Sequence, residues 1–166
     1  MNSKAKNIST GGILVALTII VLYLSLIIRI NTLALLTLSS IFVPIAIIRN
    51  NIKTGVFVYI ASSIIALFLI PIDTSILYIL YFGNFGIIKF FIEKLNNKPF
   101  EIILKLAFSN IIFFIIYMFF KYAILNFTLA FPLWIFVILA QAFILLYDFA
   151  ITLLITYYFR RFHNRF

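Results

Sequence analysis

Long apolar runs alternate with short polar stretches along the whole chain. Six of the runs are long enough for a helix to cross the hydrocarbon core of a bilayer, and they cover about 8–28, 32–48, 54–70, 74–92, 102–125 and 132–159. None of them alternates polar and apolar residues as the strands of a membrane barrel do. Because backbone polar groups in lipid must be satisfied within the segment, the pattern predicts six transmembrane helices.

Proline and charge mark the connections between these runs. Pro44 lies near the end of the second predicted helix, which is short, and Pro71 stops the third. The connection Glu93–Glu101 has mixed charges and Pro99, which predicts a solvated turn; a docking site for a cytoplasmic partner is the alternative. The short connections favour antiparallel packing of successive helices. We therefore predict one all-α domain, a helical bundle over residues 1–166.

Composition excludes the common soluble classes. Of the 166 residues, 66% are hydrophobic and only 10% are charged, whereas soluble domains have about 25% charged residues. There is no cysteine, and the single histidine, His163, lies in the basic tail. Thiolate and disulfide chemistry are therefore excluded, and so is imidazole chemistry inside the membrane. We expect a non-enzymatic protein without a metal or another cofactor, and we expect its first apolar run to be a retained helix rather than a cleaved signal peptide.

The basic residues predict an orientation. Eleven of the thirteen lysines and arginines lie at one set of helix ends, and only Arg29 and Lys121 lie at the other. By the positive-inside rule both termini are expected in the cytoplasm, in a multi-pass protein of the plasma membrane. The net charge of +9 then indicates contact with anionic lipid headgroups rather than with nucleic acid.

Polar residues inside the predicted helices need an explanation, because they are costly in hydrocarbon. Asp148 and Gln141 are seven residues apart in the last helix and therefore share nearly one face. One interpretation is that Asp148 pairs with Lys89 or Lys105 and fixes helix packing; a role in proton or cation coupling is the other.

Two amides lie inside other predicted helices. Asn84 and Asn110 are each interpreted either as an interhelical hydrogen bond or as a ligand contact. Beside Asn84, Gly83 and Gly86 allow close helix approach or a local kink.

The outer connections bring together a cation, an anion, amides and an indole. Such a set suits a small amphipathic ligand, while an interfacial aromatic belt with solvated loop ends is the default interpretation. With two residues of the fourth helix, the candidate ligand-binding residues are Arg29, Asn31, Asp73, Tyr78, Asn84, Asn126 and Trp134.

Small residues four positions apart occur on two helices. Gly12 and Ala16 form such a pair on the first helix, and Ser62 and Ala66 form one on the third. These pairs let another helix approach closely. Packing inside the bundle is the default interpretation of both.

The first helix and the architecture together resemble a known family. The segment Lys6–Leu17, with Gly12 and Ala16 at its small positions, resembles the helix by which substrate-binding S components of energy-coupling factor (ECF) transporters contact their transmembrane coupling subunit. The resemblance implies a subunit that binds a small, vitamin-like molecule near the outer face, with ABC-type ATPases as further partners. The stretch Tyr81–Lys89 is also similar to uncharacterised small membrane proteins of low-GC Gram-positive bacteria.

Other functions compete with this one. No nucleotide-binding loop occurs in the chain, so an uptake subunit would take its energy from a partner. A non-catalytic scaffold similar to the MreD family of rod-shape-determining subunits is one alternative, and a stand-alone secondary transporter is another.

Overall fold

The computed structural model of the protein describes residues 3–123 and 133–162, and within these ranges it contains helices and no strand. Six helical stretches are long and apolar enough to cross a membrane: Ala5–Ile27, Thr32–Arg49, Ile52–Leu69, Ile72–Glu93, Lys98–Tyr122 and Val137–Tyr157. The predicted all-α class and the six membrane-length helices are therefore confirmed, with ends that differ from the predicted ones by a few residues.

The chain divides into two compact units, Met1–Lys94 and Leu95–Phe166. We call them the N-terminal unit and the C-terminal hairpin. The N-terminal unit holds four of the membrane-length stretches, and the hairpin holds the other two. A single six-helix bundle stays a prediction.

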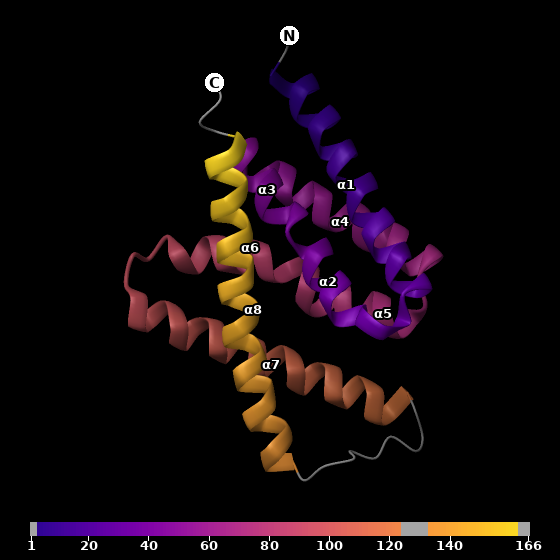
Figure 1. Ribbon diagram of the computed structural model, residues 1–166, viewed down its shortest axis with the longest axis vertical. Helices are drawn as coiled ribbons and strands as arrows, with labels where there is room; N and C mark the ends of the chain where they lie inside the picture. Colours follow the sequence, from indigo (N-terminus) through magenta and orange to yellow (C-terminus); the bar gives the residue numbers. More distant parts are fainter. Residues whose placement is uncertain (1–2, 124–132, 163–166) are drawn as a thin grey trace. The chain divides into compact units, whose positions relative to one another are not determined.

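Helix α1 (Ser3–Ile27) is the long element of the N-terminal unit. It packs along α4 (Ile52–Leu69) and against both halves of the second membrane-length stretch. Figure 1 shows α1 in indigo passing across this group of helices. Buried side chains of α1 and α4, such as Leu22 and Val58, form the apolar core of the unit.

The second membrane-length stretch is broken into α2 (Thr32–Ser40) and α3 (Phe42–Arg49). The Ser39 and Ser40 hydroxyls donate to carbonyls of their own helix at 2.7 and 2.6 Å. Pro44 lies in the first turn of α3, where its missing N–H is tolerated. The proline therefore lies just after an interruption of the helix at Ile41 rather than only near the helix end.

The fourth stretch is also irregular. It runs through α5 (Ile72–Leu77), the π-helical segment η2 (Tyr78–Phe82) and α6 (Gly83–Glu93). The wide turn closes with a bond from the Gly83 N–H to the Tyr78 carbonyl, and the Tyr59 hydroxyl donates to the Ile79 carbonyl at 2.9 Å. Single π-turns are frequent at functional sites. The π-turn ends next to Gly83, and the kink proposed for Gly83 stays a prediction.

Gly86 lets α6 lie directly against α3. A Cβ atom at Gly86 would come within 2.6 Å of Cδ of Pro44, a distance that real Cβ atoms do not reach without a shift of the backbone or the ring. The prediction that Gly86 allows close helix approach is confirmed. The absence of a side chain at Gly86 permits the contact between α3 and α6, which belong to the second and fourth membrane-length stretches.

Helix ends in this unit follow local sequence rules. The Asn51 side chain caps α4 by accepting the backbone N–H of Thr54 at 2.9 Å. Ile70 is extended, as expected for a residue that precedes proline, so α4 ends before Pro71 as predicted. Asn96 has a φ of 53° in the turn between α6 and the next helix, a conformation that asparagine tolerates better than most residues.

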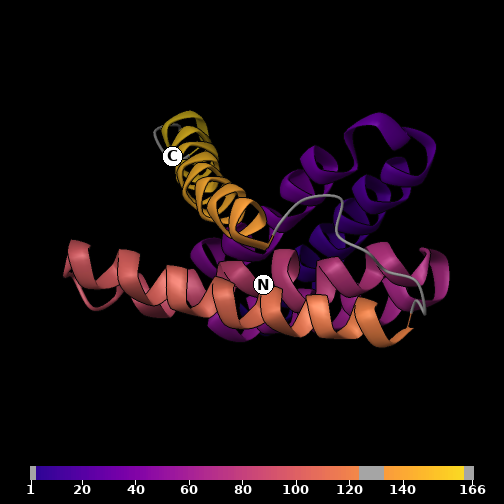
Figure 2. The same ribbon diagram turned by 90° about the horizontal axis from the view of Figure 1, so that it is seen from below.

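The C-terminal hairpin consists of α7 (Lys98–Ala123) and α8 (Leu133–Phe162). The two helices cross instead of lying side by side over their whole length (Figures 1 and 2). Pro99 and Glu101 lie in the first turn of α7, so the exposed turn at 94–97 is shorter than the predicted connection Glu93–Glu101.

Candidate functional site

The contact between α7 and α8 contains an ion pair. The Lys105 ammonium donates to Oδ2 of Asp148 at 3.0 Å, and the side chains are 7% and 24% exposed. Of the two lysines proposed as partners of Asp148, Lys105 is therefore confirmed. The other candidate, Lys89, forms an ion pair with Glu93 on its own helix at 2.8 Å.

An amide pair lies farther along the same two helices. Nε2 of Gln141 donates to Oδ1 of Asn110 at 2.6 Å. The sequence suggested an interhelical bond for Asn110 and a shared face for Gln141 and Asp148, and the structure combines the two. Together the ion pair and the amide pair form a polar seam, which we define as Lys105, Asn110, Gln141 and Asp148. Residue numbers rise along α7 and fall along α8 from the ion pair to the amide pair, although the two helices cross rather than pack side by side (Figure 1).

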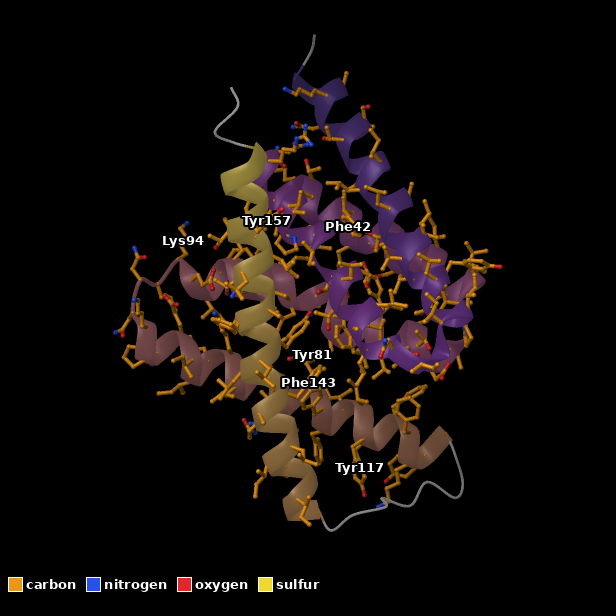
Figure 3. All side chains as sticks on the ribbon, viewed as in Figure 1. Phe42, Tyr81, Lys94, Tyr117, Phe143 and Tyr157 are labelled. Carbon is orange, nitrogen blue, oxygen red and sulfur yellow. The ribbon has the colours of Figure 1, made fainter. Side chains whose placement is uncertain are left out.

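A cleft of about 320 Å³ opens beside the amide pair. Its wall on α7 is aromatic, and its wall on α8 is formed by smaller side chains. The lining residues are Asn110, Phe113, Phe114, Tyr117, Val137, Ala140 and Gln141. Figure 3 shows Phe143 where α8 passes over α7 and Tyr117 farther along α7, toward its C-terminal end. The cleft therefore lies on the side of the crossing that is remote from the ion pair.

Sequence reasoning found the two amides of this cleft but missed its aromatic wall. Phe113, Phe114 and Tyr117 follow Asn110 by three, four and seven residues, the spacing of one helix face. That spacing was the available signal. It was hidden because phenylalanine is abundant throughout the chain, with 21 residues.

The outer-connection candidates fall into two groups. Asn31 and Asp73 are exposed. Asn31 lies in the short helix between α1 and α2, and Asp73 lies in the first turn of α5. The α1–α2 and α4–α5 connections lie at the same end of the N-terminal unit (Figure 1). Arg29 lies in the short helix Arg29–Asn31, but its side chain is not described. Asn126 lies outside the described residues, and of Trp134 only the position in α8 is described. An outer pocket formed by these residues stays a prediction.

The two candidates of the fourth stretch differ in environment. Tyr78 is fully buried, and its hydroxyl lies 2.7 Å from the Ser62 hydroxyl, which also donates to the Val58 carbonyl. The side chain of Asn84 is half-buried, and its amide makes no hydrogen bond with the described residues. Tyr78 therefore ties α4 to the π-turn, whereas Asn84 keeps an amide that could bind a ligand.

The two small-residue pairs also differ. Ser62 and Ala66 are fully buried inside the N-terminal unit, as the default interpretation predicted. Gly12 and Ala16 are exposed, and a Cβ atom at Gly12 would meet nothing within 4 Å. Each of the other four glycines would meet a neighbouring side chain. For Gly12 and Ala16 the N-terminal unit supplies no packing partner, and packing inside a complete bundle stays a prediction.

Comparisons of the chain with family models, curated proteins and solved structures give no match.

Proposed function

We propose that the protein is the solute-binding membrane subunit of an uptake transporter of the ECF type, energised by a separate ATPase module. The exposed Gly12–Ala16 face of α1 supports this most directly. Glycine inside a helix costs about 1 kcal/mol relative to alanine, and at Gly12 no packing within the unit explains the cost. A partner helix that approaches the α1 backbone closely would explain why glycine is present at this position.

The hairpin supports the solute-binding part of the proposal. Ligand sites are concave, mostly apolar and supplied with a few polar groups that orient the ligand. The cleft beside Asn110 and Gln141 fits this description. A pure scaffold needs no such cleft, so this feature favours transport over the MreD-like alternative.

Co-purification tests the partnership. The chain would be tagged at its C-terminus and extracted gently from native membranes, and mass spectrometry would identify what accompanies it. ABC-type ATPases together with a multi-span coupling protein are the expected result. Cell-wall or division proteins in their place would favour the scaffold.

Two α1 variants sharpen this test. Gly12→Leu and Ala16→Leu should each abolish capture of the partners, because a bulky side chain keeps a second helix away from the backbone. Ala34→Leu is the matched control, since Ala34 is an exposed small residue of α2. If Gly12→Leu leaves capture intact while the protein stays folded, docking through α1 is refuted.

The proposed orientation places both termini in the cytoplasm of a plasma-membrane protein, and the absence of native cysteine makes it directly testable. Asp73 and Lys94 are both exposed and lie at helix ends that the proposal puts on opposite sides. In intact cells a membrane-impermeant maleimide should label Asp73→Cys, and it should label Lys94→Cys only after permeabilisation. The reverse pattern would overturn the orientation.

A second candidate function is a stand-alone secondary transporter. Discontinuous helices are a usual feature of such proteins, and here the interrupted second stretch contacts the π-turn of the fourth, α2 against η2. Purified protein in proteoliposomes would then take up solute without any ATPase, driven by a proton gradient. Asp148→Asn should abolish that uptake if Asp148 couples it.

A further inference from the structure

The chemistry of the α7–α8 cleft goes beyond the statement that a solute binds. Its volume of about 320 Å³ lies at the small end of the range for ligand sites. The seven lining residues include no charged side chain. A charged molecule would lose its hydration there without gaining a counter-charge, so the cleft favours a neutral ligand.

The amide pair has one N–H donor group and one carbonyl acceptor that its own hydrogen bond does not use. The bond from Gln141 to Asn110 uses one N–H of glutamine and one lone pair of the asparagine carbonyl. The Asn110 NH₂ group and the Gln141 carbonyl retain their capacity, and neither residue makes a further hydrogen bond with the described residues. Exchanging oxygen and nitrogen in both amides leaves the same inventory. The lining of the cleft therefore includes one donor and one acceptor that the amide pair does not use.

The walls complete the preference. Phe113, Phe114 and Tyr117 form one side, and Val137 and Ala140 form the other. Aromatic rings stack on flat partners at favourable energy, and the small Ala140 side chain leaves space opposite them. An aromatic wall therefore favours a planar ring over a branched aliphatic molecule.

We propose that the cleft binds a neutral, planar heteroaromatic molecule that carries a lactam edge, meaning an N–H next to a C=O. The carbonyl of this edge accepts from the Asn110 amide and its N–H donates to the Gln141 carbonyl. This inference rests on the proposed solute-binding function and names the ligand class of that function. It moves the binding residues from the predicted outer connections into the hairpin.

The first experiment uses a defined probe. The full chain in lipid nanodiscs would be titrated with tritiated 2-quinolinone, a neutral bicyclic lactam, with empty nanodiscs as the blank. Saturable binding is expected, and naphthalene, which has the shape without the lactam edge, should compete at least tenfold more weakly, because one lost hydrogen bond of about 1.4 kcal/mol is already a factor of ten. Equal competition by the two molecules would overturn the proposal.

Variants place the probe in the cleft. Ala140→Phe should abolish saturable binding because the larger side chain fills the cleft. Ala142→Phe, at an exposed position outside the lining, should leave the binding unchanged. The double variant Asn110→Leu/Gln141→Leu replaces both amides by side chains of similar size, so the fold is expected to persist, and it should weaken 2-quinolinone at least tenfold while leaving naphthalene unchanged. Insensitivity of binding to either change in a folded protein would refute the site.

One competing occupant is a lipid acyl chain. If native mass spectrometry finds a retained lipid that is lost in Ala140→Phe, and 2-quinolinone does not bind, the ligand class is refuted. The proposed function is judged separately by capture of partners. Loss of capture in Gly12→Leu without 2-quinolinone binding would uphold the transport subunit and reject only the lactam.

Discussion

The N-terminal unit and the C-terminal hairpin use polar side chains differently. In the N-terminal unit buried hydroxyls, including those of Thr18 and Ser25, donate to carbonyls of their own helix at 2.8 and 2.6 Å. In the hairpin the polar seam joins side chains of two helices, 31 and 43 residues apart in sequence. The first arrangement satisfies hydroxyls while helices pack closely through small residues. In the second arrangement the bond between the helices is lost when either side chain of a pair is removed.

This difference suggests a division of labour. Between lipid-embedded helices association depends on close packing and interhelical hydrogen bonds rather than on the hydrophobic effect. The N-terminal unit combines close packing, as Gly86 against Pro44 illustrates, with interhelical hydrogen bonds such as that of the Tyr59 hydroxyl to the Ile79 carbonyl. The hairpin relies more on a few polar pairs and keeps a cleft between its helices. Variants should therefore affect the two units through different mechanisms.

The largest effect is expected at the ion pair of the hairpin. Lys105→Met leaves the Asp148 carboxylate without its lysine and should lower the free energy of unfolding by about 3 kcal/mol, as for other buried pairs that lose one partner. Adding Asp148→Leu should restore most of the loss. Unfolding in mixed detergent and SDS, followed by fluorescence of Trp134, the single tryptophan, measures both. Lys94→Met, at an exposed turn, is the control.

The stabilities of the single variant Lys105→Met and the double variant with Asp148→Leu test whether the polar pair stabilises the hairpin. A double variant as unstable as Lys105→Met alone would show that the lost stability comes from packing of the side chains. A single variant as stable as the parent protein would show that the ion pair contributes little, and the contrast between the two units would disappear.

In the N-terminal unit the matching experiment enlarges glycine. Gly86→Ala places a methyl group against the rigid ring of Pro44 and should cost about 2 kcal/mol, as overpacking does. Gly12→Ala, on the exposed face, should instead stabilise the isolated protein by up to about 1 kcal/mol through helix propensity. Circular dichroism during SDS unfolding gives both values. Equal effects of the two substitutions would contradict the packing argument.

A smaller loss is expected at the π-turn. Tyr78→Phe removes the contact with the Ser62 hydroxyl while keeping the buried ring, and should cost about 1 kcal/mol. Ser62 still donates to the Val58 carbonyl, so its own hydroxyl keeps a partner. Tyr23→Phe, at an exposed tyrosine, should be neutral. A stability loss in both variants would point to the ring environment rather than to this hydrogen bond.

Much of the helical architecture could be predicted from sequence because its signals are local. Apolar run length gave the six stretches, and Pro71 gave the end of α4 through its effect on Ile70. The interruption at Ile41 was not predicted. It depends on how Ser39, Ser40 and Pro44 bond and pack, and the hydropathy of the run does not change there. Hydropathy does not register those bonds.

The candidate site was harder to predict because its residues meet only in three dimensions. Asp148 and Gln141 were found as costly polar groups, and two lysines were proposed for Asp148. Choosing Lys105, and pairing Gln141 with Asn110, needed the register of α7 against α8. The exposure of Gly12 likewise depended on which face of α1 the other helices cover. Sequence spacing shows which residues share a helix face, but it does not show which helix packs against that face.

The smallest expected effect concerns the amide pair. A double-mutant cycle with Asn110→Leu, Gln141→Leu and both together should give a coupling free energy of about 0.6 kcal/mol, the average for such bonds between membrane helices. Unfolding in SDS followed by Trp134 fluorescence provides the four values. A coupling of zero would mean that the two amides do not bond in the membrane, and the cleft would then lack a fixed donor and acceptor for the lactam edge. A weak but measurable coupling suits a binding site, because it orients both amides while leaving their remaining donor and acceptor to a ligand.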